Sequence, residues 1–384
     1  MNPGLIVIIA LIVVVVIASI LIIRRNAIAD EQNNTEPNDF GIQNPPAIIY
    51  RFDEVIQPTP PPISISPTPG TPTVCNEIVW NVIPGAPSRA WRSSLFIPEL
   101  NIIVYGSSDL TNSIAITTVG SGIYSTPNTP RSAVVLIYSP TLGNGQGRIV
   151  AAGFTSTMFS DDAGLTWSLG QGFPLATNTQ WSSGAWSDDL GLFVIGTNTG
   201  VIGRGDGSFW TTVTRPSNTQ SITSMIWTTL GGGKFIGTQF DQGAPSGTGY
   251  IISSNDGNNW TRHSLTGVPQ TNWFDFAYSP ELGMIMMVGA FGPSIATTTS
   301  DPTLDDWTYS TGSGETGQTV VWASGCQEFV SSTFSSHATS PDGINWTNRG
   351  LHGVSGQITM AYVPSIDTIV SAGFNGALAE GNYI

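Results

Sequence analysis

The sequence carries little charge and almost no lysine. Of its 384 residues only 10% are Asp, Glu, Lys or Arg, and Lys234 is the single lysine. Soluble helices carry such residues on the face that meets water, so this composition argues against a mainly helical body. The formal net charge of −14 offers no positive surface for phosphate backbones, and nucleic acid is therefore not expected as a partner.

Cysteine and histidine are also scarce. Cys75 and Cys326 fit no zinc-binding spacing, and they would pair as a disulfide only in an oxidising compartment. We expect two separate reduced thiols and keep the disulfide as the alternative. His263, His337 and His352 lie far apart in sequence, so surface or loop positions are expected rather than a joint metal or general-base site. No cofactor and no metal site is predicted.

A long apolar run occupies the N-terminus. Residues 5–23 contain one polar side chain, Ser19, and as a helix they would span about 28 Å, close to the thickness of a bilayer core. This predicts a transmembrane anchor over residues 1–25. Arg24 and Arg25 follow the run and no basic residue precedes it, so the positive-inside rule predicts that the rest of the chain lies on the cytoplasmic side. The alternative is a cleaved signal peptide with a processing site near residues 27–29.

Residues 26–73 form a proline-rich linker. Its densest parts are residues 58–62, Pro-Thr-Pro-Pro-Pro, and residues 67–72, Pro-Thr-Pro-Gly-Thr-Pro. Proline at this density favours extended polyproline II over a collapsed coil, so we expect a passive spacer. The alternative is that residues 48–50 and 63–65 dock on a partner as short strands.

The rest of the chain, residues 74–384, is repetitive. Each repeat has an aromatic residue, a short turn and then an apolar strand of small residues. The seven aromatic positions are Phe96, Tyr138, Trp186, Trp227, Tyr278, Trp322 and Tyr362, and consecutive ones stand 40 to 51 residues apart. Short strands at a period in the forties are typical of four-stranded propeller blades, and the strand after each turn is expected to be central and buried on both sides. The sequence therefore predicts an all-β, seven-bladed β-propeller.

A second motif falls later in several repeats. Its complete form is residues 160–167, Ser-Asp-Asp-Ala-Gly-Leu-Thr-Trp; residues 254–260 and 340–346 are one residue shorter, and residues 205–210 and 305–307 are degenerate copies. In such a turn Asp accepts backbone N–H bonds, Gly takes a positive φ and Trp packs on the sheet. The residues expected in these structural roles are Asp162, Gly164, Trp167, Asp256, Gly257, Trp260, Asp342, Gly343 and Trp346.

This motif resembles the Asp-box, or BNR, repeat Ser-x-Asp-x-Gly-x-Thr-Trp. That repeat occurs in sialidase-like propellers and in propellers resembling the photosystem II assembly factor, and the resemblance covers roughly residues 74–384. In that family the box is structural and lies away from any active site. The resemblance therefore implies that the three aspartates are neither catalytic residues nor metal ligands.

The last repeat ends without a Trp-bearing strand, and a matching segment stands before the first repeat. Residues 78–85 read Ile-Val-Trp-Asn-Val-Ile-Pro-Gly, similar to the Trp strands of the other repeats. We therefore expect Val79, Trp80 and Val82 to complete the last blade. Such closure removes the open sheet edges that invite aggregation.

The resemblance raises glycoside hydrolysis, but the catalytic motifs of sialidases are missing. As a family those enzymes use three arginines, an Arg-Ile-Pro motif, a Tyr–Glu pair and a further acidic residue. No Arg-Ile-Pro follows the first repeat, and Glu99 and Glu281 fall in the repeated turns, where a structural role is expected. No catalytic residue is predicted. The alternative that two carboxylates form a pair for glycoside hydrolysis stays open at this point.

Together these features predict a membrane-anchored, non-catalytic propeller that acts as a structural or protein-interaction scaffold. One form of this prediction is a minor virion component that links an inner membrane to the coat, and another is a cellular membrane-assembly factor. The alternative is a surface carbohydrate-binding protein or a sialidase-like glycoside hydrolase, which requires the propeller outside the cell.

Overall fold

The computed structural model describes Cys75 and residues 77–384 apart from 144, 155, 173–178, 218, 241–247, 267–271, 291–294, 311–316, 353–355 and 374. The predicted anchor, the linker, and Arg24 and Arg25 lie outside the described residues. Within the part of the chain that is described, no helix is long and apolar enough to cross a membrane.

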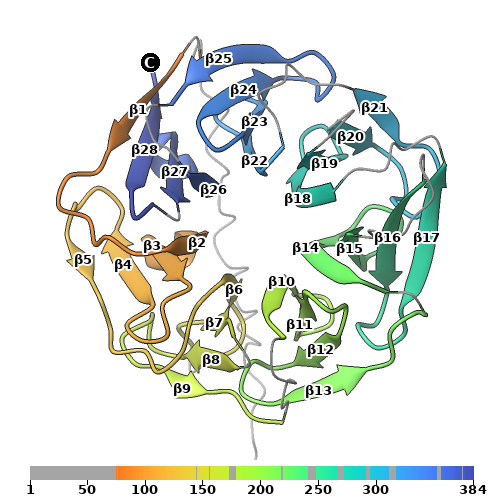
Figure 1. The fold of residues 1–384 in the computed structure, drawn as a ribbon, viewed down its shortest axis with the longest axis horizontal. Helices are drawn as coiled ribbons and strands as arrows, with labels where there is room; N and C mark the ends of the chain where they lie inside the picture. Colours follow the sequence, from red (N-terminus) through yellow and green to blue (C-terminus); the bar gives the residue numbers. More distant parts are fainter. Residues whose placement is uncertain are drawn as a thin grey trace, which may run out of the picture. The chain divides into compact units, whose positions relative to one another are not determined.

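Seven four-stranded antiparallel sheets surround a common axis, as Figure 1 shows. Blade 1 comprises β2 (Trp91–Ile97), β3 (Ile102–Ser107), β4 (Ile114–Thr118) and β5 (Tyr124–Ser125); blade 2 comprises β6 (Val135–Ser139), β7 (Arg148–Ala152), β8 (Thr157–Ser160) and β9 (Ser168–Leu169). Blade 3 comprises β10 (Trp181–Ser187), β11 (Leu192–Thr197), β12 (Ile202–Gly205) and β13 (Trp210–Val213); blade 4 comprises β14 (Ser221–Thr228), β15 (Lys234–Phe240), β16 (Thr248–Ser254) and β17 (Thr261–Thr266). Blade 5 comprises β18 (Asn272–Ser279), β19 (Met284–Ala290), β20 (Ile295–Thr298) and β21 (Thr308–Ser310); blade 6 comprises β22 (Thr319–Ala323), β23 (Glu328–Ser332), β24 (Ser336–Ser340) and β25 (Thr347–Leu351). Blade 7 comprises β26 (Gln357–Val363), β27 (Thr368–Gly373), β28 (Leu378–Tyr383) and β1 (Ile78–Val82).

The ring is closed by the N-terminal strand. β1 runs antiparallel to β28, with Val79 opposite Asn382, Trp80 opposite Gly381 and Val82 opposite Ala379. In Figure 1 this strand is the outermost one of the last blade. The predicted seven-bladed propeller and its closure by residues 78–82 are confirmed.

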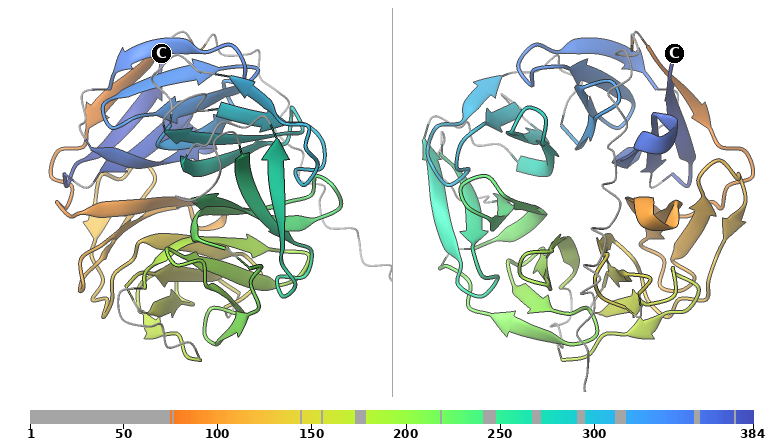
Figure 2. Two further views of the ribbon diagram at one scale, coloured as in Figure 1. Left: turned by 45° about the vertical axis from the view of Figure 1, so that its right-hand side comes forward. Right: turned by 180° about the vertical axis from the view of Figure 1, so that it is seen from behind.

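Burial explains why the second strand of each blade is so apolar. All six residues of β3 and all six of β27 are buried, because each of these strands has a neighbour on both sides in its own sheet and a blade packed on each face. The hydrophobic clusters lie between blades rather than within them: Ile116 of blade 1 and Ile149 of blade 2, for example, belong to one cluster. The views in Figure 2 show the blades stacked face to face around the axis. The core is therefore divided into contacts between neighbouring blades.

The seven aromatic residues of the repeat occupy equivalent places. Each is the penultimate residue of an innermost strand, just before the turn to the second strand. In blades 1 and 7 this turn is a 3-10 helix, η1 (Pro98–Leu100) and η2 (Pro364–Ile366), with Pro in the first turn. Asn101 and Asp367 end these helices in the left-handed conformation, with φ of 52° and 49°. The short turn that the sequence predicts after each aromatic residue is therefore the connection from the first to the second strand of the blade.

The two cysteines form a disulfide. Cys75, which precedes β1, is bonded to Cys326 in the turn between β22 and β23, and their Cα atoms are 5.7 Å apart. The prediction of two separate thiols was therefore wrong. Their sequence separation of 251 concealed the pairing, because only ring closure brings the segment before β1 next to blade 6.

Candidate functional site

One face of the propeller carries two sets of turns. Because strands alternate in direction within each blade, the turns from first to second strand and from third to fourth strand emerge on the same face. We call it the turn face, and the other side the opposite face. An ion pair between the two sets of turns is consistent with their lying on one face. Nζ of Lys234, at the start of β15, lies 2.6 Å from Oδ2 of Asp301, in the turn before β21.

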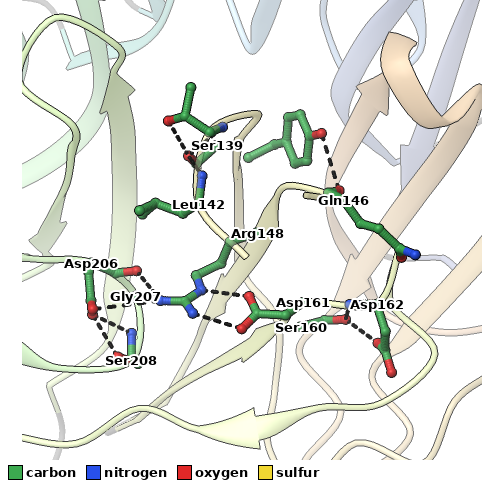
Figure 3. Close-up of polar contacts among 12 residues, drawn as sticks. Ser139, Leu142, Gln146, Arg148, Ser160, Asp161, Asp162, Asp206, Gly207 and Ser208 are labelled. Carbon is green, nitrogen blue, oxygen red and sulfur yellow. Dashed lines mark hydrogen bonds and ion pairs between the residues drawn. The ribbon is translucent and has the colours of Figure 1, made fainter. Parts of the chain in front are cut away.

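Arg148 joins two blades on the turn face. Figure 3 shows its guanidinium between Asp161 of blade 2 and Asp206 of blade 3. Nε and Nη2 donate to the two carboxylate oxygens of Asp161 at 2.7 Å each, and Nη1 donates to the backbone carbonyl of Asp206 at 2.8 Å. The hydrogen bonds to Asp161 raise the pKa of Arg148. A bidentate pair of this kind is geometrically specific, so Arg148 fixes the two turns relative to each other.

The three aspartates of the predicted motif lie in the turns between third and fourth strands. Asp162 accepts hydrogen bonds from the backbone N–H and the hydroxyl of Thr166 at 2.8 and 2.6 Å. Asp256 accepts from the backbone N–H groups of Asn258 and Asn259, and Asp342 does the same with residues 344 and 345 at 2.9 and 2.7 Å. Each carboxylate also accepts from the serine two residues before it. These contacts stabilise the turns.

The donors shift the acidity of these carboxyl groups. Burial works against ionisation at Asp342, but the hydrogen bonds from Asn345 and Ile344 outweigh it and lower its pKa to about 2. The backbone N–H groups of Asn259 and Asn258 lower the pKa of Asp256, and at Asp162 the bonds from Thr166 and Ser160 again overcome burial. These groups therefore remain ionised at neutral pH with their oxygens already occupied by donors.

The glycines and tryptophans of the motif connect neighbouring blades. Gly164 has φ of +86°, and a Cβ there would collide with the side chain of Ile116 in the preceding blade. Gly343 has φ of +73°, and a Cβ there would come within 2.9 Å of Met286 in blade 5. In each motif the Trp indole N–H donates to the Gly carbonyl, at 2.9 Å for Trp167, 3.2 Å for Trp260 and 3.3 Å for Trp346. The turn therefore sets the spacing between blades.

A polar channel runs along the axis. A cavity of about 280 Å³ is lined by residues of all seven innermost strands, among which Ser and Thr are the commonest. In five blades the innermost strand has a register shift near its N-terminal end, for example between Trp273 and Asp275. Such irregularities re-aim a side chain. The hydroxyl groups join blades: Ser94 contacts Thr359 at 2.9 Å, and Ser182 donates to the carbonyl of Ile222 at 2.6 Å.

Asp275 is the carboxylate of this channel, and no sequence motif marks it. Its Oδ2 accepts from the hydroxyl of Thr319 at 2.8 Å and from the N–H of Val320 at 3.1 Å, and its Oδ1 accepts from Ser224 at 3.2 Å and from the N–H of Phe276 at 2.9 Å. Burial raises its pKa, and these hydrogen bonds oppose the rise. Because four donors from blades 4, 5 and 6 converge on it, Asp275 is built as a connection between blades.

Two grooves open beside the aromatic residues of the repeat. The first, of about 420 Å³, lies between blades 3 and 4 and is lined by Trp186 and Trp227 together with Ala185, Asp188, Asp189, Met225, Ile226 and Thr229. The second, of about 440 Å³, spans blades 5 to 7 and includes Tyr278, Glu281, Trp322, Tyr362 and Pro364. We call them the first and second groove. Each combines aromatic walls with carboxylates at the first-to-second-strand turns.

Charge is distributed unequally between the two faces. The described turns of the turn face carry Glu99, Asp161, Asp162, Asp188, Asp189, Asp206, Asp256, Glu281, Asp301, Asp305, Asp306, Asp342 and Asp367 and no Lys or Arg. Arg148 and Lys234, at the edge of this face, are paired with Asp161 and Asp301. The described loops of the opposite face carry Arg89, Arg131 and Arg215 and one carboxylate, Asp109. The turn face is therefore the acidic side of the propeller.

The described histidines do not form a joint site with acidic ligands. His263 lies in β17, where its Nε2 is 2.8 Å from the hydroxyl of Ser253. His337 and His352 are both buried, with ring centroids 6.2 Å apart beside Trp80. The prediction of a surface or loop position was therefore wrong for His337, which lies in β24, whereas His352 lies in the loop after β25 but is buried there beside Trp80 of the closing strand.

Comparison with known proteins identifies solved structures that share the fold. No protein-family model matches the chain, and no curated protein matches its sequence. Among solved structures, YCF48 bound to D1 peptide is 14% identical with a TM-score of 0.56, and the match covers 79% of this chain and 97% of that chain. The WD40 repeats of RRP9 are 9% identical with a TM-score of 0.56, and the match covers 80% of this chain and all of that one. The protein is therefore of the seven-bladed β-propeller class.

Proposed function

We propose that this protein is a non-catalytic interaction scaffold whose propeller presents its turn face to a protein partner. The observation that carries the proposal is the concentration of carboxylates and of two aromatic grooves on one face. Aromatic residues are enriched where proteins bind one another. Exposed Leu190 and Leu282, on the turns that border the grooves, add to this surface.

A solved relative of the fold supports a protein partner. The YCF48 structure is of a propeller bound to a peptide. The likeness concerns the fold, so it does not transfer a partner, but it gives a precedent for peptide binding by such a ring.

The channel gives little support to glycoside hydrolysis. Among the described residues that line it there is one arginine, Arg92, and one carboxylate, Asp275. Sialidase-like chemistry needs three arginines, and a glycosidase of the common type needs two carboxylates. Since Asp275 is occupied by four donors, we propose that the axis has a structural role. We also propose that the Asp turns are structural Asp-box repeats.

We propose that residues 1–25 anchor the scaffold in a membrane and that residues 26–73 hold the propeller away from it. The disulfide bears on the compartment, because such bonds persist on cell surfaces and in virions and are rare in a reducing cytosol. A virion component that links an inner membrane to the coat accommodates both the disulfide and the arginines that favour a cytoplasmic orientation during synthesis. We therefore propose this form of scaffold.

Cross-linking mass spectrometry on the native membrane or particle tests the proposal. Lys234 is the single lysine and is paired with Asp301, so the reagent must react with carboxylates. Reproducible links from carboxylates of the turn face to one abundant protein are the expected result. Links confined to the chain itself, together with binding on a glycan array, would overturn the scaffold and favour the carbohydrate alternative.

A further inference from the structure

We propose that the first groove, between blades 3 and 4, receives an arginine or lysine side chain of the protein partner. The inference rests on the proposed scaffold function and adds the chemistry of the contact. Its walls are the indole rings of Trp186 and Trp227, both half-buried, and its rim carries the exposed carboxylates Asp188 and Asp189.

The two indole rings are held in place from behind. The ring centroid of Trp186 lies 4.6 Å from that of Phe193, and the centroid of Trp227 lies 4.8 Å from that of Phe235. Trp186 is fixed further by its N–H, which donates to Oδ1 of Asp188 at 2.6 Å. Because these rings are already ordered, a ligand between them would not have to pay for ordering them.

Asp189 supplies the charge that remains available. Among the described residues, no hydrogen bond or ion pair engages its carboxylate, whereas Asp188 already accepts from Trp186. Asp189 and Trp227 approach the same point: an ideal Cβ on Gly233 would lie 3.2 Å from the Trp227 ring and 3.9 Å from Oδ2 of Asp189. The carboxylate therefore stands beside the aromatic wall rather than away from it.

This combination fits a cation better than a neutral apolar group. The face of an indole ring attracts a guanidinium or ammonium group, and a carboxylate adds a charge-assisted hydrogen bond. The apolar floor of Ala185, Met225 and Ile226 suits the aliphatic stem of such a side chain. The acidity of the whole turn face would draw a basic segment toward the groove.

The second groove provides the internal comparison. Its carboxylate Glu281 accepts from the indole N–H of Trp322 at 2.7 Å, and the nearby Asp367 accepts from the Tyr362 hydroxyl at 2.5 Å. Both are thus engaged, and the groove has no counterpart of Asp189. We expect it to discriminate less between charged and neutral side chains.

The test uses the full chain in detergent and two short peptides, Gly-Gly-Arg-Gly-Gly and the same peptide with citrulline, which is nearly isosteric with arginine but neutral. Binding is followed by NMR saturation transfer to the peptide. We expect the arginine peptide to bind at least about fivefold tighter than the citrulline peptide. Asp189→Asn should remove most of this difference, and Glu281→Gln, in the second groove, should leave it unchanged.

Equal binding of the two peptides, or an Asp189→Asn variant that binds like the original chain, overturns the inference. Because Asp189 is exposed and has no partner among the residues that the structure describes, an unchanged thermal midpoint of the variant separates loss of binding from loss of folding. Trp227→Phe gives a second variant, expected to weaken the arginine peptide by a smaller factor. Cross-links from the turn face that persist in the Asp189→Asn chain would leave the scaffold standing while the groove fails.

Discussion

The indole N–H of Trp80 donates a hydrogen bond to Nε2 of His337 at 3.3 Å, and this bond joins the ring-closing strand to blade 6. His337 is only 1% exposed, and the ring of His352 packs against both His337 and Trp80. The acceptor must be unprotonated to take this bond. Burial, with the neighbouring His352 as a smaller cause, lowers the pKa of His337 to about 4.

The first prediction is that stability falls with acidification in the window set by His337. Its ordinary pKa is 6.5 and its folded pKa is about 4, so the unfolded chain binds the extra proton between these values. The free energy of unfolding should therefore be complete above pH 6.5 and decrease toward pH 4, by up to about 3 kcal/mol. Urea unfolding at a series of pH values measures it. His337→Gln should flatten this part of the profile, and an identical slope in both chains would contradict the assignment.

The second prediction concerns the disulfide. In the chain-entropy account, a bond that closes a loop of 251 residues stabilises the fold by up to about 5 kcal/mol. Reduction, or the double variant Cys75→Ser and Cys326→Ser, should therefore lower the thermal midpoint by several degrees. Mass spectrometry after alkylation without reductant should find neither cysteine labelled in the native protein. Two labelled thiols would rule out the bond and show that the two cysteines are separate thiols.

The third prediction tests the spacing between blades. Gly164→Ala places a Cβ against Ile116 at a positive φ, whereas Gly191→Ala has a positive φ of +61° and nothing within 4 Å. We expect Gly191→Ala to cost about 1 kcal/mol and Gly164→Ala clearly more, about 2–3 kcal/mol. Comparison of urea midpoints decides it, and equal costs would show that the blades are not in close contact there.

The fourth prediction concerns Asp342. Its folded pKa of about 2 lies below the ordinary value of 3.8, so its hydrogen bonds contribute stability that is complete above pH 4 and is lost as the pH falls toward 2. Asp342→Asn retains an acceptor but loses the charge. We expect the variant to be less stable at pH 7 and to lose less stability on acidification between pH 4 and pH 2 than the original chain. The same loss in both chains would exclude Asp342 as the source.

The fifth prediction separates a structural from a catalytic Asp275. Asp275→Ala leaves four donors from three blades without their acceptor, and we expect a loss of about 2–4 kcal/mol in the free energy of unfolding. Asp189→Asn, on an exposed turn and without a hydrogen-bond partner among the described residues, is the control and should change stability by less than about 0.5 kcal/mol. A stable Asp275→Ala chain that had lost a measurable glycosidase activity would reverse our assignment of the channel.

Periodicity was sufficient to predict the ring. Each blade must bury both faces against its neighbours. For this reason the aromatic residues near the ends of the innermost strands recur, and so do the apolar strands that follow them. The strand that carries Trp80 resembles the Trp-bearing strands of the other repeats for the same reason. Local motifs such as residues 160–167 could be predicted because their hydrogen bonds lie within a few residues of each other.

The features that the sequence did not predict depend on contacts between distant segments, and no local residue pattern marks these contacts. The Cys75–Cys326 bond and the Arg148–Asp206 contact link segments that only the closed ring brings together. Asp275 lines the channel next to a register shift in its strand, and no residue pattern in 272–279 predicts that shift. The first groove depends on two neighbouring blades presenting Trp186 and Trp227 side by side, which the sequence shows only as a repeat.

The position of the disulfide determines where mechanical load enters the propeller. Cys75 lies before β1, so tension on the chain that precedes it passes through the sulfur–sulfur bond into the turn between β22 and β23. The hydrogen bonds between β1 and β28 are shielded from that force, although a pull from this end would otherwise unzip them one pair at a time. If residues 1–25 anchor the chain as we propose, this bond would let the propeller bear tension from that end without separation of β1 from β28.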